Sequence, residues 1–183
     1  MYDYYNIQIP RQIAGGLLCA ILSDTVIFKS PTCTELDKNA VSELAKIAQV
    51  DDPVKLGMDM FKIKSAVVDT PASELLFRDY KDFDMNGKKV GIGQVEVIEL
   101  SQLDHIKEEL LEEMKKLKKE DRHSVFLLLT DIMQEGSELL IVSDEPEVVE
   151  KAFNIKTDKK KVWLPGVMSR KKQVVPNLQE AFK

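Results

Sequence analysis

Apolar residues recur at helical spacing through the first third of the chain. Residues 11–23 are apolar around nearly the whole helix, which predicts a helix that is buried on several sides. Residues 24–28 form a short β-prone run and predict a strand. Thr32 and Glu35 have the spacing of a capping box, which predicts that a second helix begins at Thr32 and ends near Ala48.

The spacing stays helical in two further segments and then changes to alternation. Pro53 suits a first helical turn and predicts a helix over residues 53–64, and Thr70-Pro71 predicts a short helix over residues 72–78. From residue 80, apolar residues alternate on both sides of Asn86-Gly87, which indicates a hairpin. We then expect a charged amphipathic helix over residues 101–120 and a continuous apolar strand over residues 124–132. A second strand over 137–142, a short helix over 147–153 and a last strand over 161–164 follow.

The change of period falls between residues 64 and 70, where we expect a domain boundary. It separates residues 1–66, a mostly helical piece with its linker, from residues 67–183. In the second part a hairpin, a fully apolar strand and amphipathic helices follow one another, which is typical of a mixed sheet flanked by helices. The expected fold class is therefore α/β, preceded by a mostly helical segment.

Composition narrows the class of protein. The chain has 183 residues, a formal net charge of -5 and 31% charged residues, as expected for a globular protein. The acidic balance argues against a general nucleic-acid coat, and the sequence has no run of about 18 apolar residues that would predict a membrane span. The two cysteines, Cys19 and Cys33, fit a reducing compartment, so we expect a cytoplasmic protein.

Three places could carry chemistry, and each also has a plainer interpretation. Asp24 follows an apolar helix and could bind a divalent cation, although an acidic residue there is more often part of a turn. Arg170 and Lys171 lie in Ser-Arg-Lys-Lys-Gln and would suit phosphate oxygens, although such a group is more often a solvated basic patch. Lys81, taken alone, is one lysine on an expected strand. The histidines and cysteines form no known metal or nucleophile motif.

Longer strings in the sequence resemble a known family. Residues 20–34 (AILSDTVIFKSPTCT) resemble the segment that closes the catalytic domain of family II inorganic pyrophosphatases, which are manganese- or cobalt-dependent enzymes of the DHH phosphoesterase superfamily. Residues 166–176 (GVMSRKKQVVP) resemble their C-terminal substrate-binding signature. Lys81-Asp82-Phe83 and Thr130-Asp131-Ile132 also match, so the resemblance extends from about Ile13 to the end of the chain.

The resemblance implies roles for the candidate residues. Asp24 matches a manganese ligand, whereas Lys81, Arg170 and Lys171 match residues that bind pyrophosphate. None of the residues in this chain matches a catalytic group. The implied reaction is hydrolysis of diphosphate to two phosphates by a metal-activated water, with Mn²⁺ or Co²⁺ in the complete enzyme and Mg²⁺ on the substrate.

The sequence also departs from the family. The histidine and aspartate motifs expected upstream, including the Asp-His-His triplet, are absent. We therefore expect residues 1–66 to be the end of a DHH catalytic domain and residues 67–183 a DHHA2 substrate-binding domain. Asp24 alone would not hold a metal stably, so we expect the chain alone to be inactive. The expected partners are pyrophosphate and an N-terminal DHH domain in the same or another chain; a homodimer is a further option, and neither nucleic acid nor membrane is expected.

Two other functions stay open at this point. The basic group could belong to a non-catalytic module that binds phosphate or polyphosphate, since the resemblance extends to the DHHA2 domains of exopolyphosphatases. The chain could also be half of an enzyme that a separately encoded N-terminal partner completes. Turnover by the chain alone would indicate the enzyme, and binding without turnover would indicate the module. Turnover only after mixing with an N-terminal partner would indicate the half-enzyme.

Overall fold

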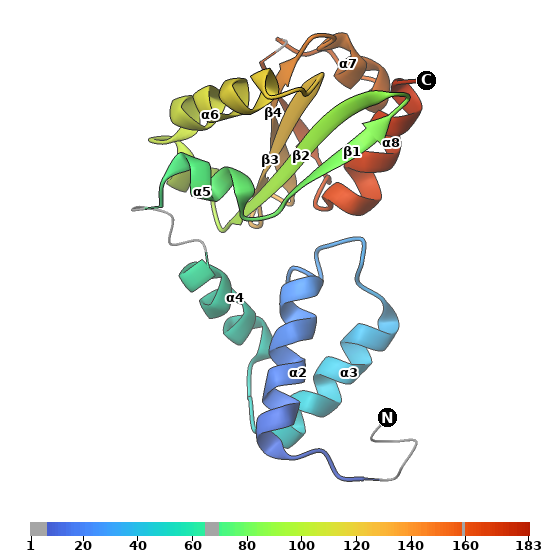
Figure 1. Ribbon diagram of the computed structural model, residues 1–183. Coiled ribbons are helices and arrows are strands. Elements are labelled where there is room, and N and C mark those ends of the chain that lie inside the picture. Colours follow the sequence, from blue (N-terminus) through green and yellow to red (C-terminus); the bar gives the residue numbers. More distant parts are fainter. Residues whose placement is uncertain (1–6, 65–69, 159) are drawn as a thin grey trace. The chain divides into compact units, whose positions relative to one another are not determined.

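The computed structural model describes residues 7–64, 70–158 and 160–183 (Figure 1). The chain folds into two compact units, Met1–Ile63 and Lys64–Lys183. Most of the segment between residues 64 and 70, where the sequence predicts the boundary, lies outside the described residues. Each unit is described by itself below.

The first unit consists of α2 (Arg11–Asp24), α3 (Glu35–Ala48) and most of α4 (Pro53–Lys64). The expected helix over residues 53–64 is confirmed, and Asp52 caps it by accepting a hydrogen bond from the Lys55 N–H at 2.9 Å. The core is formed by Ala14, Leu18 and Leu22 of α2 and by Val41, Leu44, Ala45 and Ala48 of α3.

One face of α2 differs from the expectation. Ile13 and Leu17 are 45% and 42% exposed, so the prediction that this helix is buried on several sides is wrong for this face. The spacing of four residues places both side chains on one side of the helix. The buried residues Ala14, Leu18 and Leu22 lie on another side, where α2 packs against α3.

The strand expected over residues 24–28 is absent from this described segment, which forms a turn instead. Val26, Ile27 and Phe28 have φ values of 48°, 52° and 67°, in the left-handed region that β-branched or bulky residues rarely adopt. The Ile27 N–H donates to the Leu22 carbonyl at 2.9 Å, and the Thr25 hydroxyl donates to the Ile21 carbonyl at 2.7 Å. Carbonyl groups at the end of α2 thus accept the hydrogen bonds of this segment, which leaves no need for a partner strand, while Val26 and Ile27 stay buried.

The cap of α3 is Thr34, so the prediction of Thr32 is wrong. The Thr34 hydroxyl accepts from the Asp37 N–H at 3.4 Å, and the Asp37 carboxylate accepts from the Thr34 N–H at 2.8 Å. The capping-box geometry is therefore present two residues later than expected. Thr32 instead donates to the Asp24 carbonyl at 3.1 Å and so closes the preceding turn.

The second unit is a five-stranded mixed sheet in the order β1-β2-β3-β4-β5. Only β2 and β3 are parallel among these neighbours. In Figure 1, α5 and α6 cover one face and α7 and α8 the other, and β3 in the middle is buried at every position. The α/β prediction is thus confirmed. The bounds are α5 Ala72–Phe77, β1 Tyr80–Met85, β2 Lys88–Val97, α6 Lys107–Lys119, β3 Ser124–Asp131, β4 Gly136–Ser143, α7 Glu147–Phe153, β5 Lys161–Pro165 and α8 Val175–Ala181.

The charged helix expected over residues 101–120 begins later than predicted. A 3₁₀ helix occupies Leu100–Leu103, and α6 begins at Lys107. The buried Asp131 carboxylate accepts from the Leu100 N–H at 2.9 Å and so holds the connection against the end of β3. The expected amphipathic character is nevertheless present, because Leu110, Met114 and Leu117 of α6 are buried, as is Leu103 before it.

The hairpin between β1 and β2 is confirmed. Asn86 and Gly87 have φ values of 57° and 76°, as a two-residue turn with positive φ at both positions requires. The Asp84 carboxylate accepts from the Gly87 N–H at 3.1 Å. The Asn86 amide donates to the Phe182 carbonyl at 3.0 Å and so ties the turn to the C-terminal segment.

Gly91 leaves room for the Tyr80 ring, so a methyl group there should destabilise the sheet. A Cβ at Gly91 would lie 1.7 Å from the Tyr80 hydroxyl oxygen, which donates to the Asp82 carboxylate at 2.7 Å. We expect Gly91→Ala to lower the free energy of unfolding by about 1–3 kcal/mol. Urea unfolding followed by the fluorescence of Trp163, the single tryptophan, reports on this sheet.

The matched control for Gly91→Ala is Gly15→Ala. Gly15 lies inside α2, and an added Cβ there meets nothing within 4 Å. That change should leave the Trp163 transition where it is, since α2 belongs to the other unit. Equal urea midpoints for Gly91→Ala and the unaltered chain would contradict the packing assigned to Tyr80.

Candidate functional site

The segment Ser-Arg-Lys-Lys-Gln is folded back on itself by its own first and last residues. The Gln173 amide oxygen accepts from the N–H groups of Met168 and Ser169 at 2.9 and 3.0 Å, and its NH₂ group donates to the Gly166 carbonyl at 2.8 Å. The Ser169 hydroxyl accepts from the Lys172 N–H at 3.3 Å. These bonds shape the loop and lead into a π-helical turn, Arg170–Val174, which continues into α8.

Arg170 is held inside the second unit. Arg170 is 8% exposed, and its guanidinium donates to the Asp79 carboxylate at 2.7 Å. The same group donates to the Ile92 carbonyl at 3.1 Å and also to the Asp79 carbonyl. The sequence places Arg170 in the basic group but gives no sign of Asp79, which lies 91 positions away.

Lys81 is brought to the same part of the sheet as Arg170. In the β1-β2 ladder Lys81 faces Ile92, whose carbonyl accepts from Arg170. Directly opposed residues of an antiparallel pair point to the same side of the sheet. Since Ile92 packs in the core cluster shared with Val174 and Leu178, Lys81 lies on the face that carries the Arg170 segment and α8.

Lys81 and Lys171 are two accessible cations of this arrangement. Both are exposed, and within the described ranges neither has a hydrogen bond or an ion pair to another side chain. An ammonium group presents three donors to an incoming anion. The loop and the start of β1 therefore offer two accessible cations beside a third, Arg170, whose guanidinium is engaged by the chain itself.

Tyr80 and Asp82, the neighbours of Lys81 along β1, anchor this strand on the face of the sheet opposite Lys81. The Arg122 guanidinium grips both oxygens of Asp82 at 2.8 and 2.9 Å, and Tyr80 donates to the same carboxylate at 2.7 Å. Burial raises the pKa of Asp82, but the hydrogen bonds from Arg122 and Tyr80 outweigh it and hold this pKa below its usual value. Burial and the Asp82 carboxylate raise the pKa of Tyr80. This cluster anchors the edge strand that carries Lys81.

Asp24, the candidate metal ligand, is the last residue of α2 and is exposed. Across residues 7–64, 70–158 and 160–183, the structure contains no group of three His, Cys, Asp or Glu side chains that could hold a metal ion. Manganese favours several oxygen ligands, so one exposed carboxylate does not fit a resident Mn²⁺ site. The described part of the chain therefore lacks the donor set for the metal that the resemblance implies.

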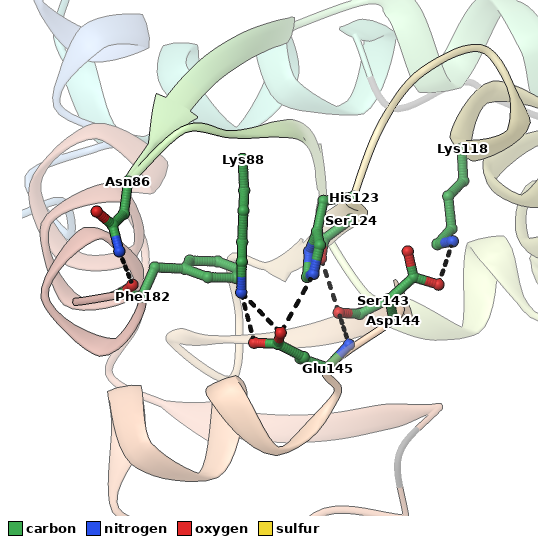
Figure 2. A network of polar contacts seen from close by, with 9 residues as sticks. All are labelled: Asn86, Lys88, Lys118, His123, Ser124, Ser143, Asp144, Glu145 and Phe182. Carbon is green, nitrogen blue, oxygen red and sulfur yellow. Dashed lines mark hydrogen bonds and ion pairs between the residues drawn. The ribbon is translucent and has the colours of Figure 1, made fainter.

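His123 belongs to a polar network at the start of β3, shown in Figure 2. Its Nδ1 lies 2.8 Å from the Ser124 hydroxyl and its Nε2 lies 3.6 Å from the Glu145 carboxylate, which Lys88 also binds at 2.7 Å. The order Ser-His-Glu is that of a hydrolytic triad. However, Ser124 is fully buried and is hydrogen-bonded to Ser143 at 2.7 Å, so its hydroxyl is not available as a nucleophile.

His105, the other histidine, is exposed before α6. Both cysteines are free thiols of intermediate exposure. Within the part of the chain that the structure describes, none of the helices has the length and apolar character needed to cross a bilayer.

Three comparisons place the chain among known proteins. A family model described as "DHHA2 domain" matches residues 58–181. The "Probable manganese-dependent inorganic pyrophosphatase" of Archaeoglobus fulgidus is 57% identical over 183 residues, which is 100% of this chain and 57% of that protein. The "Manganese-dependent inorganic pyrophosphatase" of Methanocaldococcus jannaschii is 51% identical over 178 residues, or 96% of this chain and 57% of that protein.

The fold has a solved counterpart. The solved structure titled "Crystal structure of Methanococcus jannaschii putative family II inorganic pyrophosphatase" aligns with a TM-score of 0.87 at 49% identity. The alignment covers 96% of this chain and 57% of that chain. The chain therefore spans 57% of the length of these relatives.

Proposed function

The chain belongs to the DHHA2 domain family, and we propose that it is the pyrophosphate-binding part of a manganese-dependent inorganic pyrophosphatase. The observation that carries this proposal is the placement of Lys81 and Arg170 at one end of the β1-β2 ladder, with Lys171 next in sequence. Arginine and lysine are the side chains that suit the oxygens of a highly charged phosphate anhydride. The names of the relatives support the same substrate.

The three cations have different parts in binding. Lys81 and Lys171 are exposed, so their ammonium groups donate to phosphoryl oxygens with little rearrangement of the protein. Arg170 has to exchange the Asp79 carboxylate for a phosphate oxygen. The Asp79 side chain is 54% exposed whereas that of Arg170 is 9% exposed, so a polyvalent anion can reach this ion pair from the Asp79 side and compete for the guanidinium.

The cations also serve the hydrolysis that we propose for the complete protein. In that reaction water attacks one phosphorus atom, the bridging P–O bond breaks, and two phosphate ions leave. Negative charge builds on the leaving and transferred groups, and fixed cations lower the energy of that charge distribution. Manganese in the complete protein would supply a Lewis acid. Because the described residues do not fit such a site, no metal-dependent step is assigned to this chain.

We further propose that a DHH part, in the same or another chain, covers the exposed apolar face of α2 and completes the site. Exposed Ile13 and Leu17 on that face and the greater length of the relatives support this partner. The two free thiols support a cytoplasmic location.

The alternative function is a binding module that holds phosphate compounds without turnover. The observation in its favour is that the described cations are in place while the described acidic residues form no metal cluster. Both functions predict pyrophosphate binding, so binding is tested first. Isothermal calorimetry should show saturable binding of pyrophosphate that is tighter than that of sulfate. An absence of binding at millimolar pyrophosphate would overturn both.

Replacing Asp24 by asparagine should leave pyrophosphate affinity of the chain unchanged. Asp24 lies in the first unit, whereas Lys81, Arg170 and Lys171 all lie in the second. The measurement is the same calorimetric titration, with the unaltered chain as reference. A change of about tenfold in the dissociation constant, which corresponds to about 1.4 kcal/mol, would contradict the assignment of anion binding to the second unit alone.

A further inference from the structure

A buried chain of polar side chains runs beneath the loop that carries the cations. It consists of Gln94 on β2, Thr130 on β3 and Ser137 on β4, which are 8%, 0% and 0% exposed. These residues interrupt the apolar core at neighbouring positions of three strands. Such groups are costly to bury unless each finds a hydrogen-bond partner.

Gln94 makes the central contacts. Its amide oxygen accepts from the Arg170 N–H at 3.1 Å. Its NH₂ group donates to the Met168 carbonyl at 3.1 Å and to the Thr130 hydroxyl at 3.0 Å. One buried amide thus binds the backbone on both sides of Ser169, with an acceptor facing the N–H and a donor facing the carbonyl.

Thr130 and Ser137 connect Gln94 by hydrogen bonds to a third backbone group, the Val167 carbonyl. The Ser137 hydroxyl donates to the Val167 carbonyl at 2.6 Å and lies 2.8 Å from the Thr130 hydroxyl. Since Ser137 uses its one proton on Val167, Thr130 must donate to Ser137 and accept from Gln94. The direction of every bond in the relay is therefore fixed, from Gln94 through both hydroxyls to Val167.

We propose that Gln94 is a positioning residue for pyrophosphate binding, with Thr130 and Ser137 as its relay to Val167. The inference rests on the proposed function of the loop. The three side chains hydrogen-bond the backbone of Val167, Met168 and Arg170, so they orient the peptide groups from which Arg170 and Lys171 project. A loop ordered before binding loses less conformational entropy when the anion arrives.

The test replaces Gln94 by leucine, which keeps much of the volume and removes all three hydrogen bonds. We expect the dissociation constant for pyrophosphate, measured by calorimetry on the full chain, to rise roughly tenfold or more. Hydrogen exchange of the Arg170 amide, measured by NMR, should become faster, because its acceptor is lost. Unfolding followed by Trp163 fluorescence reports whether the sheet persists.

The matched control is Ser124→Ala. Ser124 is as buried as Ser137 and is hydrogen-bonded to Ser143 at 2.7 Å, but it lies at the other end of the β3-β4 pair (Figure 2). It should lower stability without changing pyrophosphate affinity or Arg170 exchange. If Gln94→Leu does not fold, Thr130→Val breaks the relay and Thr130→Ser restores its hydroxyl, so affinity should fall in the first and return in the second.

The outcomes separate this inference from the proposed function. Equal pyrophosphate affinity and equal Arg170 exchange in Gln94→Leu and the unaltered chain would overturn the positioning role. An equal loss of affinity in Ser124→Ala would also overturn it, because the effect would then be one of stability. An unaltered chain that binds no pyrophosphate would overturn the proposed function instead, and Arg170 exchange in the variants would still decide whether Gln94 orders the loop.

Discussion

Replacing Arg170 by alanine should lower both the pyrophosphate affinity and the stability of the second unit. The change leaves the Ile92 and Asp79 carbonyls without this donor and removes a cation from the loop. We expect a loss of about 2–3 kcal/mol in the free energy of unfolding, since a buried acceptor left without its donor costs about 1–3 kcal/mol. The dissociation constant for pyrophosphate should rise by about two orders of magnitude, because a charged contact is lost and the loop is loosened.

Two other variants make the Arg170 result specific. Arg170→Lys keeps the charge but not the planar fork, so it should recover part of the affinity and little of the stability. Arg78→Ala removes an exposed arginine of the same unit that donates to the Lys64 carbonyl, and it should leave pyrophosphate binding unchanged. Calorimetry and Trp163 unfolding are measured on all three. Unchanged affinity in Arg170→Ala would remove this residue from the site.

Removing both accessible lysines should abolish most of the binding without affecting the fold. Lys81 and Lys171 are exposed, so Lys81→Ala combined with Lys171→Ala should shift the unfolding free energy by less than about 0.5 kcal/mol. Each charge-assisted hydrogen bond contributes about 1.5–3 kcal/mol, so the pair should weaken pyrophosphate binding by about 100-fold or more.

The control for the lysine pair is Lys119→Ala. Lys119 is exposed at the end of α6, on the helix layer that covers the other face of the sheet. It removes a positive charge from the same unit without altering the loop or β1. A similar loss of affinity in this control would mean that net charge, and not a site at Lys81 and Lys171, governs binding.

Local signals in the sequence predicted much of the fold. The ring of Pro53 fixes φ at a helical value, and Asn86-Gly87 tolerate the positive φ that a tight turn requires, so both elements are where they were expected. The strand predicted over residues 24–28 is wrong because β propensity reflects how side chains pack on a sheet. Here the turn after α2 supplies the backbone hydrogen bonds instead. The start of α6 was missed because the interaction of Asp131 with Leu100 is nonlocal.

The site was predicted only in part. Asp24, Lys81, Arg170 and Lys171 could be selected from matching motifs, but their roles remain predictions. Asp79 and Gln94 were missed because their partners are distant along the chain; a single polar residue within the apolar run of β2 was the available signal for Gln94.

The most direct test of the account is a pyrophosphate hydrolysis assay with Mn²⁺, on the chain alone and after mixing with the separately expressed remaining part of the Archaeoglobus fulgidus protein. The account predicts phosphate release only in the mixture, and loss of that release in the variant that lacks Lys81 and Lys171. Release by the purified chain alone at a rate similar to that of the mixture would contradict the claim that it supplies substrate-binding cations and depends on another part for the metal centre.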